Sequence, residues 1–443
     1  MSSPQFILRK INNQHILVPY TFSSNVDYII LNNTAVKIYK LFFIEKLCID
    51  DIVLNLKKIY SSINISILKD DVILIIENIN RINKINESNP HSNNSEIINF
   101  SIQRKIFEKS LADSKIISMV MLELTYHCNL KCLHCYCTHC TFTQKELTTK
   151  EIFDILEQIV ESGCLRLVLT GGEAFLRKDF EDIYIYAKKL GLIITIFSNA
   201  ILINKRLIEI FIKYPPKIIE ISVYGASNET YFKLTKDSRG FDKLINSLNL
   251  LDSYKIKYSI KTFVTQQNKN DFSKIKELAL SRNVEFRHDE KVINQINGIP
   301  IPSAIALTHF EVFQIENQEY IIDNKFILSN EDKKNSFNNN KLFYCAAGRT
   351  SCLINSFGDV SLCTRIRDVN YNIKNNKFQL IWSLLNKKSE MTTSDNFNCN
   401  LCDAFDYCSV CPSVDFMSNS EKHNEFCSFA YMRKLTNEQN LNF

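Results

Sequence analysis

Three cysteines stand close together in one loop. Cys128, Cys132 and Cys135 have the spacing C-x3-C-x2-C. Three thiolates this close can hold three irons of a [4Fe–4S] cluster, which leaves the fourth iron open to a small molecule. The alternative is zinc, which usually takes C-x2-C pairs and needs a fourth protein ligand. The nearby residues that could supply one are His127, His134, His139, Cys137 and Cys140.

A second motif, Thr170-Gly171-Gly172-Glu173, follows an apolar run that reads as a strand. Two glycines allow the backbone to approach a ligand closely, and the Glu173 carboxylate can accept hydrogen bonds from an ammonium group. Alone, this is an ordinary turn at the end of a strand. At this distance after a C-x3-C-x2-C loop, it is a more specific sign of a ligand site.

Together the two motifs resemble the signature of the radical S-adenosylmethionine (SAM) family. The resemblance implies that the amine and carboxylate of SAM bind the open iron of a [4Fe–4S] cluster, whose reduced form cleaves SAM to a 5′-deoxyadenosyl radical. It also implies that Gly171, Gly172 and Glu173 bind the amine. Ala174 departs from the proline that usually follows this motif.

Later strand ends carry further candidates for SAM binding. By the same resemblance, Ser198, Asn199 and Ser222 approach the ribose and carboxylate of SAM. Lys261 is a candidate for the SAM carboxylate or for the substrate, although a lysine in a partly exposed strand is more often structural or solvated.

The C-terminal quarter holds a second group of cysteines: Cys345, Cys352, Cys363, Cys399, Cys402, Cys408, Cys411 and Cys427. Gly358 precedes Cys363 by the spacing G-x4-C, and the whole pattern resembles the SPASM domain, apart from an interval of two residues between Cys408 and Cys411 where three are usual. A pair of zinc ribbons is the alternative reading.

The SPASM resemblance implies two auxiliary [4Fe–4S] clusters. Cys345, Cys363 and Cys411 would hold the first, with Cys352 as a possible fourth ligand. The second would be held by Cys399, Cys402, Cys408 and Cys427. Cysteines outside both patterns are expected to be inert thiols: Cys48, Cys137, Cys140 and Cys164.

Strands and helices alternate from residue 116 to about 300. Apolar runs predict strands at 117–124, 165–169, 193–197, 218–223, 258–264 and 284–287, with helices between them. Repeated strand–helix units imply a parallel sheet. Six of them resemble the partial (β/α)6 barrel of the radical SAM family, an α/β fold whose site lies at the C-terminal ends of the strands.

The N-terminal residues predict a hairpin at 6–10 and 15–19, a strand at 28–31, and helices at 35–43, 49–60 and 68–82. This is a winged helix-turn-helix-like α+β plan. DNA binding is its default function, but the helices lack a basic face and carry several acidic residues. The plan resembles the RiPP recognition element, which implies that a leader peptide adds as a strand beside the third strand.

Length and composition fit several domains in one chain. We expect a leader-binding domain at 1–83, a linker at 84–115, the barrel at 116–310, a bridging segment at 311–340 and the SPASM domain at 341–443. The 15 cysteines, with no secretory signal or membrane span in the sequence, indicate a reduced, cytoplasmic metalloprotein. The net charge of +5 without a polybasic run argues against nucleic acid and mildly favours an acidic peptide partner.

The sequence therefore predicts a radical SAM maturase of the sactipeptide or ranthipeptide type. It would take hydrogen from a ribosomal precursor peptide, bound through its leader, and form a cross-link, expected to be a cysteine thioether. An electron donor such as flavodoxin or ferredoxin would be a second partner. The alternatives are a C–C or C–O cross-link, epimerisation, or a zinc-dependent winged-helix redox regulator.

Overall fold

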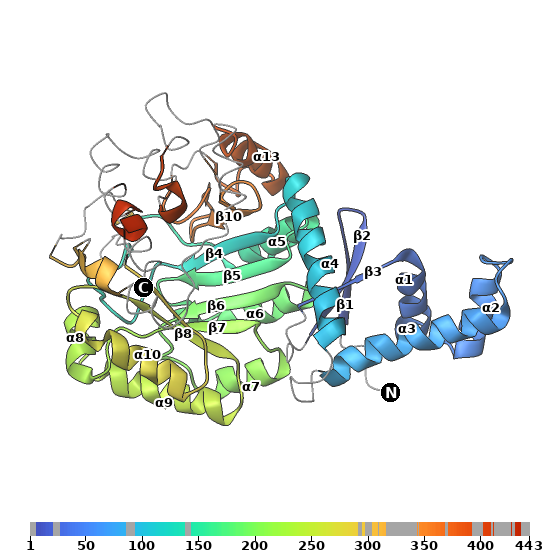
Figure 1. Cartoon of the computed structure of the whole chain (residues 1–443), viewed down its shortest axis with the longest axis horizontal. Helices are drawn as coiled ribbons and strands as arrows, with labels where there is room; N and C mark the ends of the chain where they lie inside the picture. The colour runs from blue at the N-terminus through green and yellow to red at the C-terminus, as the bar shows by residue number, and fades with distance from the viewer. Residues whose placement is uncertain are drawn as a thin grey trace.

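The computed structural model describes most of the chain, and the structural statements below concern those residues. Figure 1 shows an N-terminal sheet with its helices, then a barrel of strands and helices, then a C-terminal part beside the first barrel strand. The described residues are 6–20, 27–85, 94–137, 143–290, 295–296, 304–308, 310–315, 343, 345–367, 371–391, 402–408, 411, 427 and 430–435. Most of the bridging segment expected at 311–340 lies outside them.

The N-terminal part has the order that the sequence predicts, with strands first and helices after. The elements are β1 (Phe6–Ile11), β2 (Gln14–Pro19), β3 (Ile29–Leu31), α1 (Asn33–Tyr39), the π-helical η1 (Lys40–Ile44), α2 (Ile49–Lys57) and α3 (Ile65–Ile85). Asn12 and Asn13 both have positive φ, which suits the two-residue turn of the hairpin. The sequence favours Asn33-Thr34 as the N-cap of the first helix, but the side chain of Asn32 accepts a hydrogen bond from the backbone of Ala35, so the N-cap of α1 is Asn32.

The N-terminal sheet, in the order β1-β2-β3, is covered on both faces. One face packs Leu17 and Ile29 against Tyr39 of α1 and Ile79 of α3. The opposite face packs residues of β1, β2 and the start of β3 against α4 and the barrel; these residues are Ile11, Ile16, Val18 and Tyr28 on the sheet, with Phe107, Leu111, Leu165 and Ile193 opposite. Successive side chains of a strand point to opposite faces of the sheet, so the strands contribute residues to two hydrophobic cores.

Polar contacts fix the N-terminal part against the barrel. Arg9, only 8% exposed, donates to the backbone carbonyls of Gly191 and Val160, each at 3.2 Å. Asp27 forms an ion pair with Lys217 of the barrel. The N-terminal sheet is thus held at the end of the barrel where the strands begin.

A helix replaces much of the expected linker at 84–115. The helix α4 (Asn94–Asp113) stands between the barrel and the N-terminal sheet (Figure 1). Only a short helix near 107–111 is expected from the sequence. The reason for the difference is tertiary: Phe107 and Leu111 are buried one turn apart, while most of the other described side chains of α4 are polar and exposed or half-buried.

The barrel contains the six parallel strands that the sequence predicts. They are β4 (Met119–Thr125), β5 (Arg166–Gly171), β6 (Ile193–Ser198), β7 (Ile218–Ser222), β8 (Tyr258–Phe263) and β9 (Phe286–Asp289), paired in chain order. The helices are α5 (Thr149–Glu161), α6 (Phe180–Lys189), α7 (Lys205–Lys213), α8 (Asn228–Thr235), α9 (Gly240–Ser253) and α10 (Phe272–Ser281), with short 3-10 turns η2 (Ala174–Leu176) and η3 (Lys269–Asp271).

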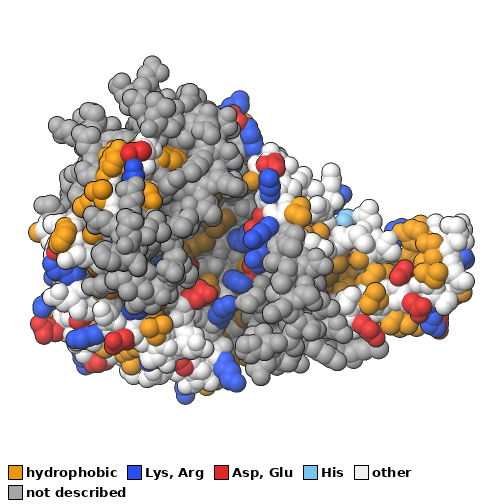
Figure 2. Space-filling view, in the orientation of Figure 1, with side chains coloured by type: hydrophobic (Ala, Val, Ile, Leu, Met, Phe, Trp, Pro, Cys, Tyr) orange, Lys and Arg blue, Asp and Glu red, His pale blue; other side chains and the backbone are white. Residues whose placement is uncertain are grey.

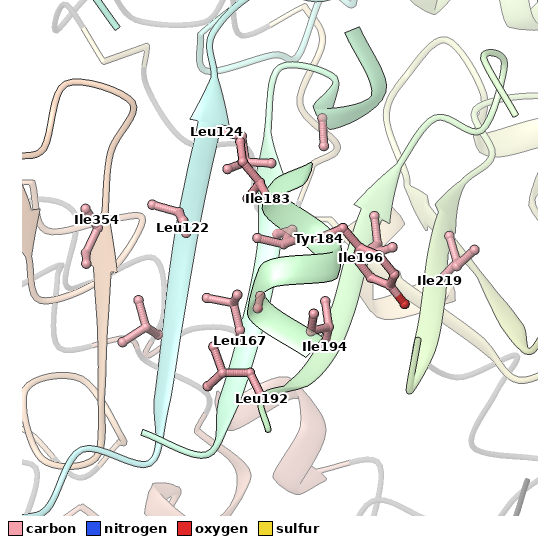
Figure 3. Packing of buried hydrophobic residues seen from close by; sticks show 14 of the residues in the cluster. Leu122, Leu124, Leu167, Ile183, Tyr184, Leu192, Ile194, Ile196, Ile219 and Ile354 are labelled. Atoms are coloured by element: carbon pink, nitrogen blue, oxygen red, sulfur yellow. The ribbon is translucent and has the colours of Figure 1, made fainter. Parts of the chain in front are cut away.

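The main core lies between the strands and the surrounding helices. Figure 3 shows branched side chains of neighbouring strands meeting Ile183 and Tyr184 of α6. The labelled strand residues are Leu122, Leu124, Leu167, Ile194, Ile196, Ile219 and Ile354. Because one face of each strand is apolar, the other face is free to carry polar groups into the lumen of the barrel.

Two C-terminal strands extend the barrel sheet. β10 (Ser351–Ile354) pairs in parallel with β4, and β11 (Val360–Ser361) pairs antiparallel with β10. The helix α13 (Phe378–Lys388) follows, and Trp382 donates to the carbonyl of Lys115 at 2.8 Å. A 3-10 turn, η5 (Phe405–Tyr407), lies among the last cysteines. The C-terminal part is thus joined directly to the first barrel strand. None of the described helices has the length and apolar character of a membrane span.

Candidate functional site

The three cysteines of the C-x3-C-x2-C loop follow β4 directly and are held from two sides. Gly172 donates to the carbonyl of Thr125 at 2.7 Å, and Glu173 donates to that of His127 at 2.9 Å. On the other side, the backbone of Lys131 donates to Thr235 at the end of α8 at 3.0 Å. Backbone hydrogen bonds therefore hold the loop in place between the ends of β5 and α8.

Neighbouring thiols of this loop raise one another's pKa. Burial raises the pKa of Cys128 to about 12, with Cys135 acting in the same direction. Burial also raises the pKa of Cys132, again with Cys135 and Cys128 adding to it. Among the described residues, no three His, Cys, Asp or Glu side chains surround the position of a single metal ion. Cys137, expected to be inert, has its sulfur 3.6 Å from that of Cys135.

The two glycines of the Gly171-Gly172-Glu173 motif approach the chain itself, whereas the sequence suggests approach to a ligand. A Cβ at Gly171, where φ is +130°, would lie 2.2 Å from the carbonyl oxygen of Thr125. A Cβ at Gly172 would lie 2.2 Å from that of His127. Side chains at either position would push the cysteine loop away from β5. The glycines thus set the distance between the loop and the strand.

Glu173 is almost fully buried and links the ends of β5 and β6. Its carboxylate accepts from Ser198 Oγ at 2.9 Å and from the backbone of Asn199 at 2.8 Å. Burial nevertheless raises the pKa of Glu173 to about 7. Asn199 in turn donates to Asn129 Oδ1 of the cysteine loop at 2.9 Å. Three of the expected SAM-binding residues therefore form one hydrogen-bonded group.

An upper cavity of about 500 Å³ opens at the C-terminal ends of the strands. Cys128, Cys132 and Cys135 line it together with Gly171, Gly172, Ser198, Asn199, Ser222 and Lys261. Nearly all the residues predicted for the site thus share one cavity. Glu173 does not line it, and its carboxylate is bonded to Ser198 and Asn199, which do.

The lumen below this cavity contains an ion-paired group that the sequence reveals only in part. Lys261 Nζ lies 3.7 Å from Glu220 and 3.2 Å above the centre of the Phe197 ring. Burial lowers the pKa of Lys261 to about 7. Arg287 forms a second ion pair with Glu220. The signal that was missed is Glu220 itself, a carboxylate inside the apolar strand 218–223.

A second buried network joins the cysteine loop to the C-terminal part. Glu123, which is not exposed, accepts from Tyr126 Oη at 2.7 Å and from Tyr136 Oη at 2.8 Å. Arg367 binds the same carboxylate through both terminal nitrogens, at 2.7 and 2.9 Å. Tyr136 directly follows Cys135, and Arg367 lies four residues after Cys363. The signal for Glu123 in the sequence was again a lone carboxylate in an apolar strand.

The C-terminal cysteines fall into two groups. Burial raises the pKa of Cys345, and the nearby Cys363 and Cys411 add to this effect. Burial likewise raises the pKa of Cys427, with Cys408 and Cys402 adding to it. Each of these two groups contains cysteines that the SPASM resemblance assigns to the same cluster. Cys399 lies outside the described residues.

Cys352 lies apart from both groups. It is a residue of β10, 3% exposed, within the main core. Burial raises the pKa of its thiol, and the further contribution comes from Cys164, which is also buried. Both thiols lie in the main apolar core, where buried cysteines behave as small hydrophobic side chains.

Comparison with known proteins identifies the barrel. Residues 122–279 match the family model described as "Radical SAM superfamily". These residues form a radical SAM domain. The chain is 24% identical over 254 residues to the sporulation killing factor maturation protein SkfB of Bacillus subtilis (strain 168), a match that covers 57% of this chain and 61% of SkfB.

Other relatives cover more of the chain. The subtilosin biosynthesis protein AlbA of the same organism is 23% identical over 333 residues, 71% of each protein. The crystal structure of Streptococcus suis SuiB bound to S-adenosylmethionine superimposes with a TM-score of 0.57 at 19% identity, covering 92% of this chain and 94% of SuiB. That likeness shows a shared fold over nearly the whole chain.

The radical SAM family implies a [4Fe–4S] cluster and SAM, and the residues of this domain fit both. Three thiols that affect one another's pKa line one cavity. Three thiolates are the donor set of a [4Fe–4S] cluster with one open iron. Beside them, the strand ends present backbone and side-chain polar groups from Gly172, Ser198, Asn199 and Ser222. A cavity of this size is in the range of small-molecule sites.

Proposed function

We propose that this chain is a radical SAM peptide maturase, which abstracts hydrogen from a ribosomally made precursor peptide and forms a cross-link, a cysteine thioether. The observation that carries the proposal is the upper cavity, in which Cys128, Cys132 and Cys135 meet the polar strand ends. The names of the relatives support a peptide substrate, since SkfB is a maturation protein and AlbA a bacteriocin biosynthesis protein. SuiB has also been crystallised with the precursor peptide SuiA.

When bound, the cluster and SAM supply a 5′-deoxyadenosyl radical, while the protein supplies orientation and excludes water. Cys128, Cys132 and Cys135 would hold the cluster. Ser198 and Asn199, positioned by the buried Glu173, would face the ribose and carboxylate of SAM, together with Ser222 at the end of the neighbouring strand β7. Gly171 and Gly172 would fix the distance between SAM and the cysteine loop.

The C-terminal cysteines would hold two auxiliary [4Fe–4S] clusters. Cys345, Cys363 and Cys411 would ligate the first, and Cys399, Cys402, Cys408 and Cys427 the second. The burial of Cys352 beside Cys164 supports leaving it out of the first set. An iron of the first cluster would then lack a protein ligand, and soft sulfur, such as a substrate thiolate, suits that position. The auxiliary clusters would accept the electron released when the thioether forms.

The N-terminal part would bind the leader of the precursor as a RiPP recognition element does. β3 is the edge of its sheet in the order β1-β2-β3, and Ile75 and Ile79 of α3 lie next to it. An added strand would gain main-chain hydrogen bonds from β3 and side-chain contacts from α3. Binding there raises the local concentration of the rest of the peptide near the barrel.

The proposal is tested on the full chain purified without oxygen. Three cubane clusters predict about twelve iron and about twelve sulfide ions per chain. With reductant and SAM, the chain should release 5′-deoxyadenosine, and Cys128→Ala should abolish this because one of three ligands of the open cluster is lost. Cys48→Ala, at an exposed thiol that caps α2, is the matched control and should retain the rate. Deoxyadenosine formation by Cys128→Ala at the wild-type rate would refute the radical SAM chemistry.

The peptide substrate needs a separate experiment. A candidate precursor encoded beside the gene would be co-expressed with the chain, and its mass measured. A thioether lowers the mass by about 2 Da, the loss of two hydrogens, and removes one free thiol. An unchanged mass together with active SAM cleavage would mean that this peptide does not receive a cross-link.

A further inference from the structure

A second cavity lies at the opposite end of the barrel, where the strands begin. This basal cavity has a volume of about 520 Å³ and is lined by residues in or next to β5 to β9, together with Asp27 from the N-terminal part and Arg104 from α4. Figure 2 shows Lys and Arg side chains gathered where the barrel meets the N-terminal part. The site described above does not use this cavity.

Basic side chains outnumber acidic ones around the basal cavity. The basic residues are Arg104, Arg166, Lys217, Lys257 and Arg287, and the acidic ones are Asp27, Glu220 and Glu285. Glu108 lies just outside the lining and forms an ion pair with Arg166. With Glu108 included, there are still five basic side chains and four carboxylates.

Two of these carboxylates each form ion pairs with two basic side chains. Asp27 forms ion pairs with both Lys217 and Arg104, the latter at 3.7 Å. Glu220 does the same for Arg287 and for Lys261 at 3.7 Å. Each of these carboxylates therefore serves two cationic groups. A ligand that brings its own carboxylates would complete this charge balance.

The position of the basal cavity connects the N-terminal sheet to the upper cavity. Asp27, which lines the basal cavity, stands two residues before β3, the edge strand. Arg287 lines both cavities. A peptide that lies along β3 and continues past Asp27 would thus meet the basal cavity, which shares Arg287 with the upper cavity.

We propose that the basal cavity binds an acidic segment of the peptide substrate, situated between the part held by β3 and the residue that is modified. This inference rests on the proposed function and adds to it a class of substrate: precursor peptides with aspartate or glutamate in that segment. The cavity would act as a guide, holding the peptide in one direction while its modified residue enters the upper cavity.

The test uses a defined probe, an octaglutamate peptide labelled with a neutral dye, and measures its fluorescence anisotropy with the full cluster-loaded chain. Octaglutamine and the oligonucleotide dT8 are compared under the same conditions. We expect octaglutamate to bind best, and to be released by 1 M salt, where the Debye length falls to about 3 Å. Equal binding of octaglutamine would refute charge recognition, and tighter binding of dT8 would assign the cavity to nucleic acid instead.

Charge-reversal variants locate the binding. Lys257→Glu changes an exposed residue of the basal cavity, and we expect it to weaken octaglutamate binding by about tenfold, as repulsion replaces attraction. Lys233→Glu on α8, an exposed lysine outside the cavity, is the control and should bind as wild type does. If both variants lose affinity equally, the effect is one of net charge, and the proposal fails.

A further measurement separates this inference from the proposed function. Deoxyadenosine formation without peptide should be the same in wild type and Lys257→Glu, because residue 257 does not line the upper cavity. Absent octaglutamate binding with normal deoxyadenosine formation would refute the guide and leave the radical SAM chemistry standing. Absent deoxyadenosine formation in wild type would refute the proposed function itself.

Discussion

Arg367 places both terminal nitrogens of its guanidinium on the two carboxylate oxygens of Glu123, at distances of 2.7 and 2.9 Å. The pair is buried and joins residues that are 244 positions apart. Through Tyr136 it reaches the loop of the three cysteines, and through residues 363–367 it reaches one of the C-terminal cysteine groups. The pair therefore fixes the distance between the two parts of the protein that would carry clusters.

Glu123→Gln should weaken the fold considerably. The amide keeps the shape of the side chain but leaves the buried guanidinium of Arg367 without a counter-charge, which costs about 3–5 kcal/mol in comparable cases. Thermal unfolding of the full chain, followed by circular dichroism, measures this loss. The control is Glu181→Gln, which removes a more exposed ion pair with Arg206 and should cost at most about 1 kcal/mol. Similar losses for both variants would mean that the buried pair has no special role.

Cys352→Ala and Cys402→Ala should differ in iron content. Cys352 is buried beside Cys164, so its loss should leave the iron count of the wild type. Cys402 lies in a cysteine group, so its loss should remove about four irons per chain. We expect Cys402→Ala to retain some SAM cleavage but to form no cross-linked product. Iron loss in Cys352→Ala would restore it as a ligand of the first auxiliary cluster.

Ile30→Pro should weaken leader binding and spare the clusters. Ile30 lies in the middle of β3, opposite Ile16 of β2, and proline lacks the N–H that a strand uses in its ladder. The measurement is a titration of labelled leader peptide, with circular dichroism to confirm folding. SAM cleavage without peptide should be unaffected, because the upper cavity lies at the far end of the barrel. Unchanged affinity in a folded variant would place the leader elsewhere.

Lys188 gives the protein a pH dependence that lies outside the site. Its side chain donates to the carbonyl of Pro215 at 2.9 Å, and burial lowers its pKa from 10.5 to about 7. Between these values the unfolded chain holds a proton that the folded chain has released, so the free energy of unfolding rises with pH. Below pH 7 both states hold the proton, and this stabilisation is absent.

Comparison of Lys188→Met with wild type isolates this effect. The stability of wild type relative to the variant should rise by at most about 5 kcal/mol from pH 7 to 10.5. The neighbouring Lys189 is exposed, so Lys189→Met should show no such change. If the difference in the free energy of unfolding between wild type and Lys188→Met is constant across this pH range, Lys188 stays charged in the folded protein.

Apolar runs and motif spacings within short stretches of sequence were enough to predict the barrel strands. The six strands and the cysteine loop after the first of them depend on runs of apolar residues and on spacing within a few positions. The division of the C-terminal cysteines into two groups was an expectation from the resemblance to the SPASM domain. These features are local, so a single sequence carries them without any knowledge of the tertiary contacts.

Features that depend on distant partners could not be predicted. Glu123 and Glu220 were visible as carboxylates in apolar strands, but nothing nearby identifies Arg367 or Arg287 as their partners. The helix α4 could not be predicted because Phe107 and Leu111 are buried by residues of the N-terminal sheet and of the barrel, which are distant in the sequence. β10 could not be predicted because it is a short strand that pairs with β4, which lies far away in the sequence.

The pairing of β10 with β4 also bears on how the chain folds during synthesis. Ser118, next to β4, bonds to Thr350, which is 232 residues later. At typical rates of translation, roughly ten to fifty seconds separate the emergence of the two strands. During this time β4 presents an open edge, which other chains can join. We infer that expression at low temperature, or with a chaperone that shields strand edges, should increase the yield of soluble protein.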